Sequence, residues 1–362
     1  MEKAVSITSR FASNRAQLPV LGNILLSSQK SKIYVSSTNL EISASVQVGA
    51  KIEEDGEISV PAKVISELVA NLPKETITLS VEKEQLKISA SNFSSTILGI
   101  NAADFPKVPN SINKEKSLSI MKDDLVSALN QVLFATSMDE TRPILTGVLF
   151  LFKKGSLSLV ATDGFRLSRK TLSTKVGDDS HKSIVIPKTV LGELSRTTPD
   201  DGNVFLSVQE KEKQVIFGIG DTVLTSRLLE GEYPDFEKII PKTSSVKVLI
   251  DKEEFLRAVK LASIFARESA NIVKIKILKD SVKFSAESSA AGSQETSIDA
   301  KVESTEKDFE TAFNYRFLED FAHSVVGEEM KMEFSGPSSA GVFTDSGDTG
   351  YLHLIMPVKI QT

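Results

Sequence analysis

The feature that most constrains this chain is an internal repeat. Segments 59–73 and 184–199 each run from strand-forming residues through a proline and an amphipathic helix to a second proline, and the matching prolines are 126 positions apart. A third copy at 311–327 carries Asn314 in place of the first proline. Three copies of one supersecondary unit predict three similar domains in series. We place these domains at 1–115, 116–243 and 244–362.

Other segments repeat in the same order. LPVLGNILL at 18–26 parallels RPILTGVLF at 142–150, and NAADFPKVP at 101–109 matches EGEYPDFEKIIP at 230–241. Each match is weak alone, but their shared order and spacing support the repeat. The segments that join the domains are rich in proline and polar residues, as linkers usually are.

Each domain reads as an α+β unit. The first helices, predicted at 122–135 and 251–266, carry apolar residues at i, i+4 and i+7, which places them on one helix face. Segments 32–37, 156–162 and 276–288 alternate apolar and polar residues, as half-buried antiparallel strands do. A proline, Pro61 in the first copy and Pro187 in the second, is expected near the first helical position of the second helix. We therefore predict two helices packed on antiparallel sheet in every domain.

The first copy is shorter than the others at its start. Strands are predicted at 117–121 and 246–250, immediately before the first helices of copies two and three. Copy one has only Met1–Lys3 before its helix. The comparison predicts that one short strand of the first domain is missing at the N-terminus.

Composition excludes several classes of protein. The chain has 43 Lys and Arg against 48 Asp and Glu, a net charge of −5, which disfavours coating of nucleic acid or anionic membrane over the whole surface. It has no cysteine, and therefore no disulfide and no cysteine metal site. It also has no apolar run long enough to span a bilayer and no signal peptide at its start. We expect a cytoplasmic protein without a membrane partner.

Catalytic signatures are missing as well. The sequence has no phosphate-binding loop of the GxxxxGK[ST] type, no HExxH and no GxSxG. Its histidines, His181, His323 and His353, do not have the spacing of metal ligands. We predict no catalytic residues, no metal and no cofactor, and therefore a protein that is not an enzyme.

One stretch, LVATDGFRLSRK at 159–170, allows two interpretations. Asp163 and Arg166 have the chemistry of an acid and an anion clamp in a small active site, as in a hydrolase. However, Asp-Gly between alternating strand residues is also a turn signal. The turn is favoured, because the sequence offers no base, nucleophile and oxyanion site to complete a catalytic set.

The predicted helices share basic side chains opposite their apolar faces. If the repeats form an arc with the helices inward, these residues line a positive surface that contacts phosphates without reading bases. Such a surface would bind duplex DNA without sequence preference. The basic residues are Arg10, Lys63, Lys122, Lys188, Arg196, Arg257, Lys260, Arg267 and Arg316.

Taken together, these motifs resemble the bacterial DNA polymerase III β subunit (β sliding clamp) family over essentially the whole chain. The resemblance rests on LPVLGNILL, DETRPILTGVLF, LVATDGFRLS, EYPDFEKIIP, FNYRFLEDF and YLHLIMPVKI. It implies a DNA-clamp fold, in which two chains join head to tail into a six-domain ring around double-stranded DNA. The partners that it implies are the polymerase III α subunit, the clamp loader and repair polymerases, held through short peptide motifs. A clamp paralogue or monomeric scaffold that binds peptides without encircling DNA is the alternative.

The resemblance also assigns site residues. Arg15 and Arg142 are implied in DNA binding, and Phe93, Ser95, Phe265 and Ala266 in the dimer interface. Phe165 stands where the family often has histidine, and Lys238 where it often has arginine, so partner preference is expected to differ. The implied peptide-binding pocket consists of Leu145, Thr162, Gly164, Phe165, Arg166, Leu167, Pro234, Lys238, Ile239, Asn314, Phe317, Pro337, Ser339, Leu354, Met356, Pro357 and Val358.

Overall fold

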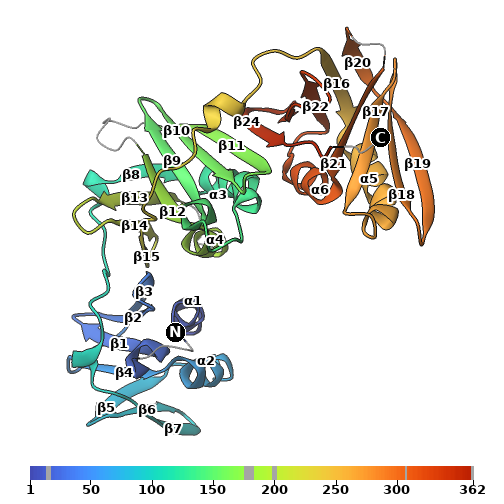
Figure 1. Cartoon of the computed structure of the whole chain (residues 1–362). Helices are drawn as coiled ribbons and strands as arrows, with labels where there is room; N and C mark the ends of the chain where they lie inside the picture. Colours follow the sequence, from blue (N-terminus) through green and yellow to red (C-terminus); the bar gives the residue numbers. More distant parts are fainter. Residues whose placement is uncertain (14–17, 175–182, 198–201, 306–307, 360–362) are drawn as a thin grey trace. The chain divides into compact units, whose positions relative to one another are not determined.

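The computed structural model describes residues 1–13, 18–174, 183–197, 202–305 and 308–359 (Figure 1). Arg15 and His181 therefore lie outside the described residues. The chain forms two compact units: unit 1 consists of Met1–Leu125 and Thr189–Leu228, and unit 2 of Val126–Lys188 and Leu229–Thr362. Because the predicted middle domain contributes to both units, the domain limits at 115 and 243 stay a prediction.

Unit 1 is built on an eight-stranded antiparallel sheet with the strand order β4-β1-β2-β3-β15-β14-β13-β8. Helices α1 (Glu2–Ser9) and α2 (Ala62–Ala70) lie side by side in this unit (Figure 1). The strands are β1 (Asn23–Gln29), β2 (Lys32–Thr38), β3 (Ile42–Gly49), β4 (Glu57–Pro61), β8 (Leu118–Met121), β13 (Asn203–Gln209), β14 (Gln214–Ile219) and β15 (Thr222–Arg227).

A second, three-stranded sheet in unit 1 has the order β5-β6-β7, formed by β5 (Thr78–Glu82), β6 (Gln85–Ala90) and β7 (Phe93–Leu98). Its outer strands β5 and β7 each pair on one side only. In copies two and three, β8 and β16 (Val246–Asp251) fill the place beside the strands equivalent to β5, namely β13 and β22 (Glu329–Phe334). No strand precedes α1 among the described residues.

Unit 2 contains a nine-stranded antiparallel sheet with the order β12-β9-β10-β11-β24-β23-β22-β16-β20. A four-stranded sheet with the order β19-β18-β17-β21 lies in the same unit. The strands not yet given are β9 (Gly147–Lys153), β10 (Ser156–Thr162), β11 (Arg166–Ser173), β12 (Ser183–Pro187), β17 (Ile272–Ile277), β18 (Ser281–Ser288), β19 (Gly292–Asp299), β20 (Lys301–Ser304), β21 (Phe309–Asn314), β23 (Gly341–Asp345) and β24 (Asp348–Ile355).

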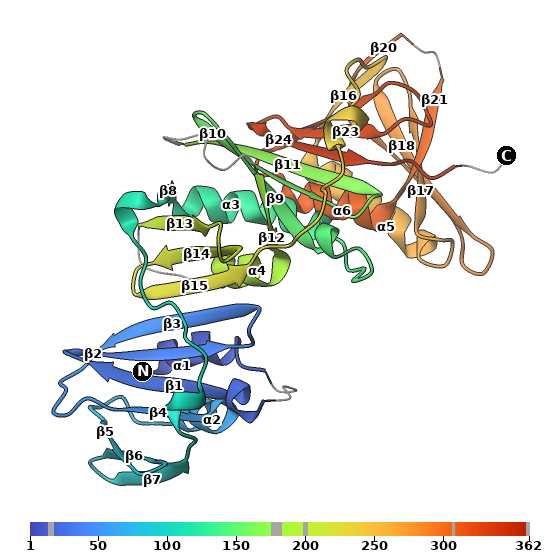
Figure 2. The ribbon, with the colours of Figure 1, turned by 60° about the vertical axis from the view of Figure 1, so that its left-hand side comes forward.

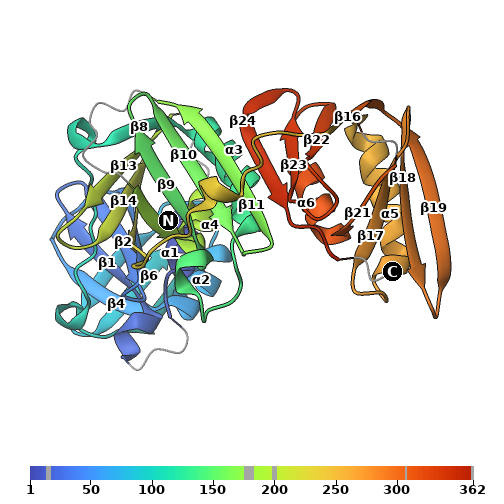
Figure 3. The same ribbon diagram turned by 45° about the horizontal axis from the view of Figure 1, so that its top comes forward.

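Helices α5 (Lys252–Ala266) and α6 (Tyr315–Ser324) pack against each other, and α5 covers strands β17, β18 and β19 (Figure 3). Between helices and sheets lies an aromatic core that includes Phe255, Phe284 and Phe321. Helix α3 (Lys122–Val132) begins in unit 1 and ends in unit 2. Helix α4 (Lys188–Arg196) begins with Lys188 of unit 2, and the rest of it belongs to unit 1. Short 3-10 helices are η1 (Pro19–Gly22), η2 (Ala102–Asp104), η3 (Lys114–Lys116), η4 (Leu133–Ala135), η5 (Pro143–Thr146) and η6 (Phe236–Ile239).

Local sequence signals explain the helix ends. Asp251 caps α5 by accepting from the Glu254 amide at 2.8 Å, and Asn314 caps α6 by accepting from the Arg316 amide at 3.0 Å. Pro61, predicted near the first helical position, is the N-cap of α2, which begins at Ala62. The proline fixes an extended backbone at the N-cap and still needs no hydrogen-bond partner for its nitrogen. The first helix predicted to end at residue 135 tightens into η4 at Leu133.

Each long sheet contains one joint at which strands of neighbouring sequence copies pair. In unit 1, β15 pairs antiparallel with β3, from Thr222 opposite Val46 to Ser226 opposite Ile42 (Figure 2). In unit 2, β11 pairs antiparallel with β24, from Arg166 opposite Ile355 to Lys170 opposite Tyr351. Both joints unite the third strand after the first helix of one copy with the last strand of the other. The remaining third strand, β19, and the remaining last strand, β7, are sheet edges among the described residues.

Candidate functional site

The Asp163–Gly164 segment is a tight turn between β10 and β11. The Asp163 carboxylate accepts hydrogen bonds from the amides of Phe165 at 2.9 Å and Arg166 at 3.0 Å. Thr162 Oγ1 accepts from the Gly164 amide at 3.1 Å and donates to the Arg166 carbonyl at 2.6 Å. Gly164 has a φ of 95°, a conformation that side chains with a Cβ rarely adopt. The acid at this position therefore shapes the chain, as the turn interpretation predicts.

The turn presents an apolar surface. Phe165 is 61% exposed, Ile239 is 49% exposed and Met356 is 42% exposed. The Met356 amide donates to the Phe165 carbonyl at 2.8 Å, so these two residues are held next to each other. We call Phe165, Ile239 and Met356 the docking patch. Large exposed apolar side chains that a fixed backbone holds in place are typical of binding surfaces.

Three predicted pocket residues lie underneath this surface instead. Leu145, Leu167 and Leu354 are 4%, 1% and 2% exposed. Leu167 stands opposite Leu354 in the β11·β24 joint, and both belong to a core cluster with Phe236. The Leu167 side chain is covered by its own chain, and its place in a peptide-binding pocket stays a prediction.

Arg166, another predicted pocket residue, is mostly buried. Its side chain is 11% exposed, and its guanidinium donates to Asp163 at 3.1 Å, to Asp320 at 2.5 Å and to the Phe134 carbonyl at 2.5 Å. The same group lies 4.5 Å from the ring centroid of Phe317 and 5.3 Å from that of Phe134. Arg166 thus ties the turn to η4 and α6.

The other predicted pocket residues fall into two groups. Val358 donates its amide to the Ala312 carbonyl at 2.8 Å, and Thr311 donates to the Pro337 carbonyl at 3.1 Å, which brings the C-terminal tail and the 336–339 loop to β21. The exposed Lys238 pairs with Asp235 at 2.8 Å, and this hydrogen bond raises the lysine pKa. Pro234 is exposed, Asn314 caps α6, and Pro357 and Ser339 are half-buried.

The predicted basic residues differ in how much charge they offer. Arg10 binds Glu193 at 2.5 Å, and Arg196 binds the same carboxylate at 2.7 Å. Arg257 pairs with Glu254. The acidic partners reduce the positive charge that the sequence pattern predicted for these helices.

The remaining cations are placed as follows. Arg142 pairs with Asp139 at 3.2 Å and donates to the Asp163 carbonyl at 3.3 Å, so it lies against the turn. Burial, followed by repulsion from Arg166, lowers the pKa of Lys188. Lys63, Lys260, Arg267 and Arg316 are exposed, and Lys122 is half-buried.

The predicted interface residues are only partly on the surface. Phe93 and Ser95 are half-buried on the edge strand β7, and Phe265 is half-buried against the core. Ala266 is fully buried, so its side chain cannot form part of an exposed surface. The exposed apolar residue at this end of α5 is Ile264, at 56%. Sequence reasoning missed Ile264 because the resemblance placed the interface only near the end of this helix, at Phe265 and Ala266.

Two kinds of site are missing from the part of the chain that the structure describes. No group of three or more histidine and carboxylate side chains gathers there closely enough to hold a metal ion. None of the helices in those residues has the length and apolar character needed to cross a membrane.

Comparison with protein families gives three matches in chain order. Residues 1–109 match the N-terminal domain of the DNA polymerase III beta subunit, residues 119–235 its central domain and residues 237–359 its C-terminal domain. These matches leave only short joints and the last residues of the chain uncovered.

Individual proteins match over nearly the same length. The chain is 30% identical over 383 aligned residues to the beta sliding clamp of Synechocystis, which covers 99% of this chain and 97% of that protein. It is 28% identical to the beta sliding clamp of Staphylococcus aureus, with 97% and 95% covered. The crystal structure of the DNA polymerase sliding clamp from Bacillus subtilis superposes with a TM-score of 0.93 at 27% identity, with 99% and 97% covered.

Proposed function

The chain belongs to the DNA polymerase III β-subunit family, the β sliding clamps, and from this premise we propose that two copies close head to tail into a ring around duplex DNA. Its function is that of a sliding clamp. The ring acts as a topological tether that keeps a bound polymerase at high local concentration on its template.

The observation that carries the ring is the pair of unused joint strands. β3 pairs with β15 and β11 pairs with β24, and in both cases the third strand after a first helix meets a last strand. The strands left over are β19 and β7, which have the same two positions in their copies. An open edge is a template for another strand. Pairing of β7 with β19 of a second copy repeats the joint and, made twice, closes a dimer.

Side chains at both edges support this pairing. Leu98 on β7 is 70% exposed, and Ile264 at the end of α5 is 56% exposed. Helix α5, which carries Ile264, packs on β19, the strand that the partner would extend. We therefore assign Ile264, together with Phe93, Ser95 and Phe265, to the dimer interface.

The topological claim has a direct test. After a clamp loader has acted, the protein should remain on nicked circular DNA through gel filtration and leave the same DNA once it is cut into a linear form. Equal retention on both forms would refute encirclement. Solution scattering separates the alternative, a monomeric peptide-binding scaffold, because it would show an open arc instead of a closed ring.

We place the docking of partner proteins at the docking patch. Phe165, Ile239 and Met356 offer apolar contact area, and methionine adapts its shape to different partners. The turn and the Arg166 network hold Phe165 in one position, so little ordering is needed on binding. Short peptide motifs with apolar anchors, from the polymerase α subunit, the clamp loader and repair polymerases, are the proposed ligands.

The remaining assignments follow from the same function. The proposed clamp carries out no chemistry and needs no cofactor, and it works in the cytoplasm. Its domains are 1–115, 116–243 and 244–362. Its DNA contact is electrostatic and independent of sequence, made by exposed cations such as Lys63 and Lys260.

A further inference from the structure

The second helices of the three sequence copies, α2, α4 and α6, carry a carboxylate at the same position. It is the sixth residue after the proline or asparagine that directly precedes each helix. In chain order these carboxylates are Glu67, Glu193 and Asp320. A charge that recurs at one position of a repeat indicates a contact that the copies share.

Two of these carboxylates bind an arginine of the preceding copy. Glu193 accepts a hydrogen bond from Arg10, the C-cap residue of α1, at 2.5 Å. Asp320 accepts one from Arg166, the first residue of β11, at 2.5 Å. The first contact links the copies that β3 and β15 join, and the second links the copies that β11 and β24 join. Both joints within the chain therefore have a carboxylate–guanidinium pair in addition to their paired strands.

The equivalent face of α2 in the first copy is open. Glu67 is exposed and makes no ion pair with the described residues. Val64, one turn earlier on α2, is 46% exposed, whereas Val190 at the same position of α4 is 0% exposed. The third copy has the half-buried Phe317 there, whose ring centroid lies 4.5 Å from the Arg166 guanidinium. The face that is covered in copies two and three therefore lacks its cover in copy one.

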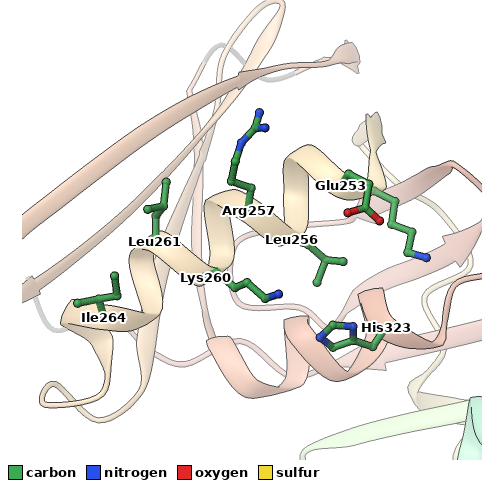
Figure 4. A pocket seen from close by; sticks show the side chains of 8 residues that line it. Glu253, Leu256, Arg257, Lys260, Leu261, Ile264 and His323 are labelled. Atoms are coloured by element: carbon green, nitrogen blue, oxygen red, sulfur yellow. The ribbon is translucent and has the colours of Figure 1, made fainter.

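The complementary groups lie at the end of α5, the first helix of the third copy. Arg267 is the C-cap residue of α5, as Arg10 is the C-cap residue of α1. Arg267 is exposed and makes no ion pair with the described residues, and Ile264, one turn earlier, is 56% exposed. Lys260, in contrast, points toward His323 of α6 (Figure 4). The end of α5 therefore offers the cation and the apolar contact that the open face of α2 lacks.

We propose that Glu67 of one copy of the chain pairs with Arg267 of a second copy, beside a contact between Val64 and Ile264. The pair repeats between two chains the carboxylate–arginine contact that joins copies one and two within a chain. This inference rests on the ring proposed above, in which β7 and β19 form the strand part of the same joint. An ion pair next to an apolar contact is screened by less water than a fully exposed pair, so it contributes more to association. A dimer closed head to tail contains this pair twice.

Exchange of charge between two variants tests the pair. Glu67→Arg places like charges opposite each other in both joints, and so does Arg267→Glu. Each variant alone should dimerise about a hundredfold more weakly than the parent in sedimentation equilibrium, which is about tenfold for each joint. A mixed dimer of the two variants has the exchanged pair in one joint and the original pair in the other. An equimolar mixture should therefore dimerise within about threefold of the parent, whereas a mixture as weak as either variant alone would overturn the proposal.

Lys260→Glu is the matched control, because it makes the same change of charge at another exposed cation of α5. It should leave the dimer unchanged and should not restore dimerisation when it is mixed with Glu67→Arg. Restoration by Lys260→Glu in place of Arg267→Glu would show that the cation is wrongly assigned.

Neutral variants test the pair without introducing repulsion. Glu67→Gln and Arg267→Gln should each weaken the dimer about tenfold, and the double variant no further, because the two residues share one interaction. Weakening that adds up in the double variant would mean that the two side chains act independently and would overturn the pair.

The parent protein separates failure of this pair from failure of the ring. A parent that dimerises and stays on circular DNA, together with variants that dimerise equally well, would refute the pair and leave the ring intact. A parent that remains monomeric in sedimentation equilibrium would refute the ring and the pair together.

Discussion

Replacement of Arg166 by alanine should loosen the turn that carries Phe165. The guanidinium makes hydrogen bonds to Asp163, Asp320 and the Phe134 carbonyl, and its side chain is 11% exposed. Removing one member of a buried ion pair costs about 3–5 kcal/mol. Because the Asp320 side chain is 43% exposed and water takes over part of the arginine's role, we expect the lower end, about 3 kcal/mol.

Hydrogen exchange of the Phe165 and Arg166 amides measures this loss locally. Both amides bind the Asp163 carboxylate, so they exchange only when the turn opens. A loss of 3 kcal/mol corresponds to exchange about a hundredfold faster. A local probe is needed because a chain of several domains does not unfold in one step.

Two companion variants sharpen the result. Arg166→Lys keeps the charge but cannot make all three bonds in their planar arrangement, so about half of the effect should remain. Arg257→Ala removes an exposed pair with Glu254 and should change stability by less than about 0.5 kcal/mol. Exchange at Phe165 that stays within threefold of the parent in Arg166→Ala would refute the role of this network.

Four further outcomes are expected. Met356→Asp should abolish binding of a partner peptide in a fluorescence polarisation assay and leave the dimer intact, whereas the buried Leu167→Asp should lower thermal stability; a soluble Met356→Asp protein with unchanged peptide affinity would contradict the docking patch. Ile264→Asp should weaken the dimer in sedimentation equilibrium, while Leu278→Asp, at another exposed apolar position of unit 2, should not; equal dimer affinity in both would contradict the interface. His353 is buried, and burial followed by repulsion from Arg166 lowers its pKa well below 6.5, so stability should fall as pH drops through 6.5, by about 1.4 kcal/mol per pH unit. This contribution should disappear from the urea midpoints of His353→Leu, and identical pH profiles would contradict it. Glu193→Gln should free Arg10 and Arg196 and steepen the salt dependence of DNA binding by about one unit or more of log K per log salt, and an unchanged slope would contradict the pairing.

The repeat and the strand alternation predicted most of the fold. The alternation of apolar and polar residues places strands well, because side chains of a strand point alternately to its two faces. Asn314, which stands where the other copies have proline, predicted the start of α6, because an N-cap side chain bonds an amide within three residues of it. The first helix of the third copy also lies where its apolar spacing placed it. Strand alternation, helix caps and helix faces are set by residues a few positions apart, so the sequence alone is enough to predict them.

The site was predictable only in part. Alternation places Arg166 and Leu167 on opposite faces of β11, but it does not say that β24 adds beside this strand and that both faces become covered. The partners of Arg166 come from Phe134, 32 positions away, and from Asp320, 154 positions away. No local pattern reports such contacts. Phe165 escapes burial because it belongs to the turn, where the strand alternation has not yet begun.

The acidic partners of the basic helix residues bear directly on how the proposed clamp moves. Each phosphate contact that a protein makes adds about 0.9 to the slope of log K against log salt, so a lining of unpaired cations would bind DNA tightly and resist displacement. Glu193 pairs with Arg10 and Arg196, and Glu254 pairs with Arg257. These pairs leave fewer unpaired positive charges to contact the phosphates of the duplex. A ring that is retained by closure does not need that affinity. Each phosphate contact must break before the ring moves to its next position on the DNA, so fewer contacts mean a lower barrier to that movement. Partial neutralisation of the basic helix residues by Glu193 and Glu254 therefore favours sliding over tight binding at one position.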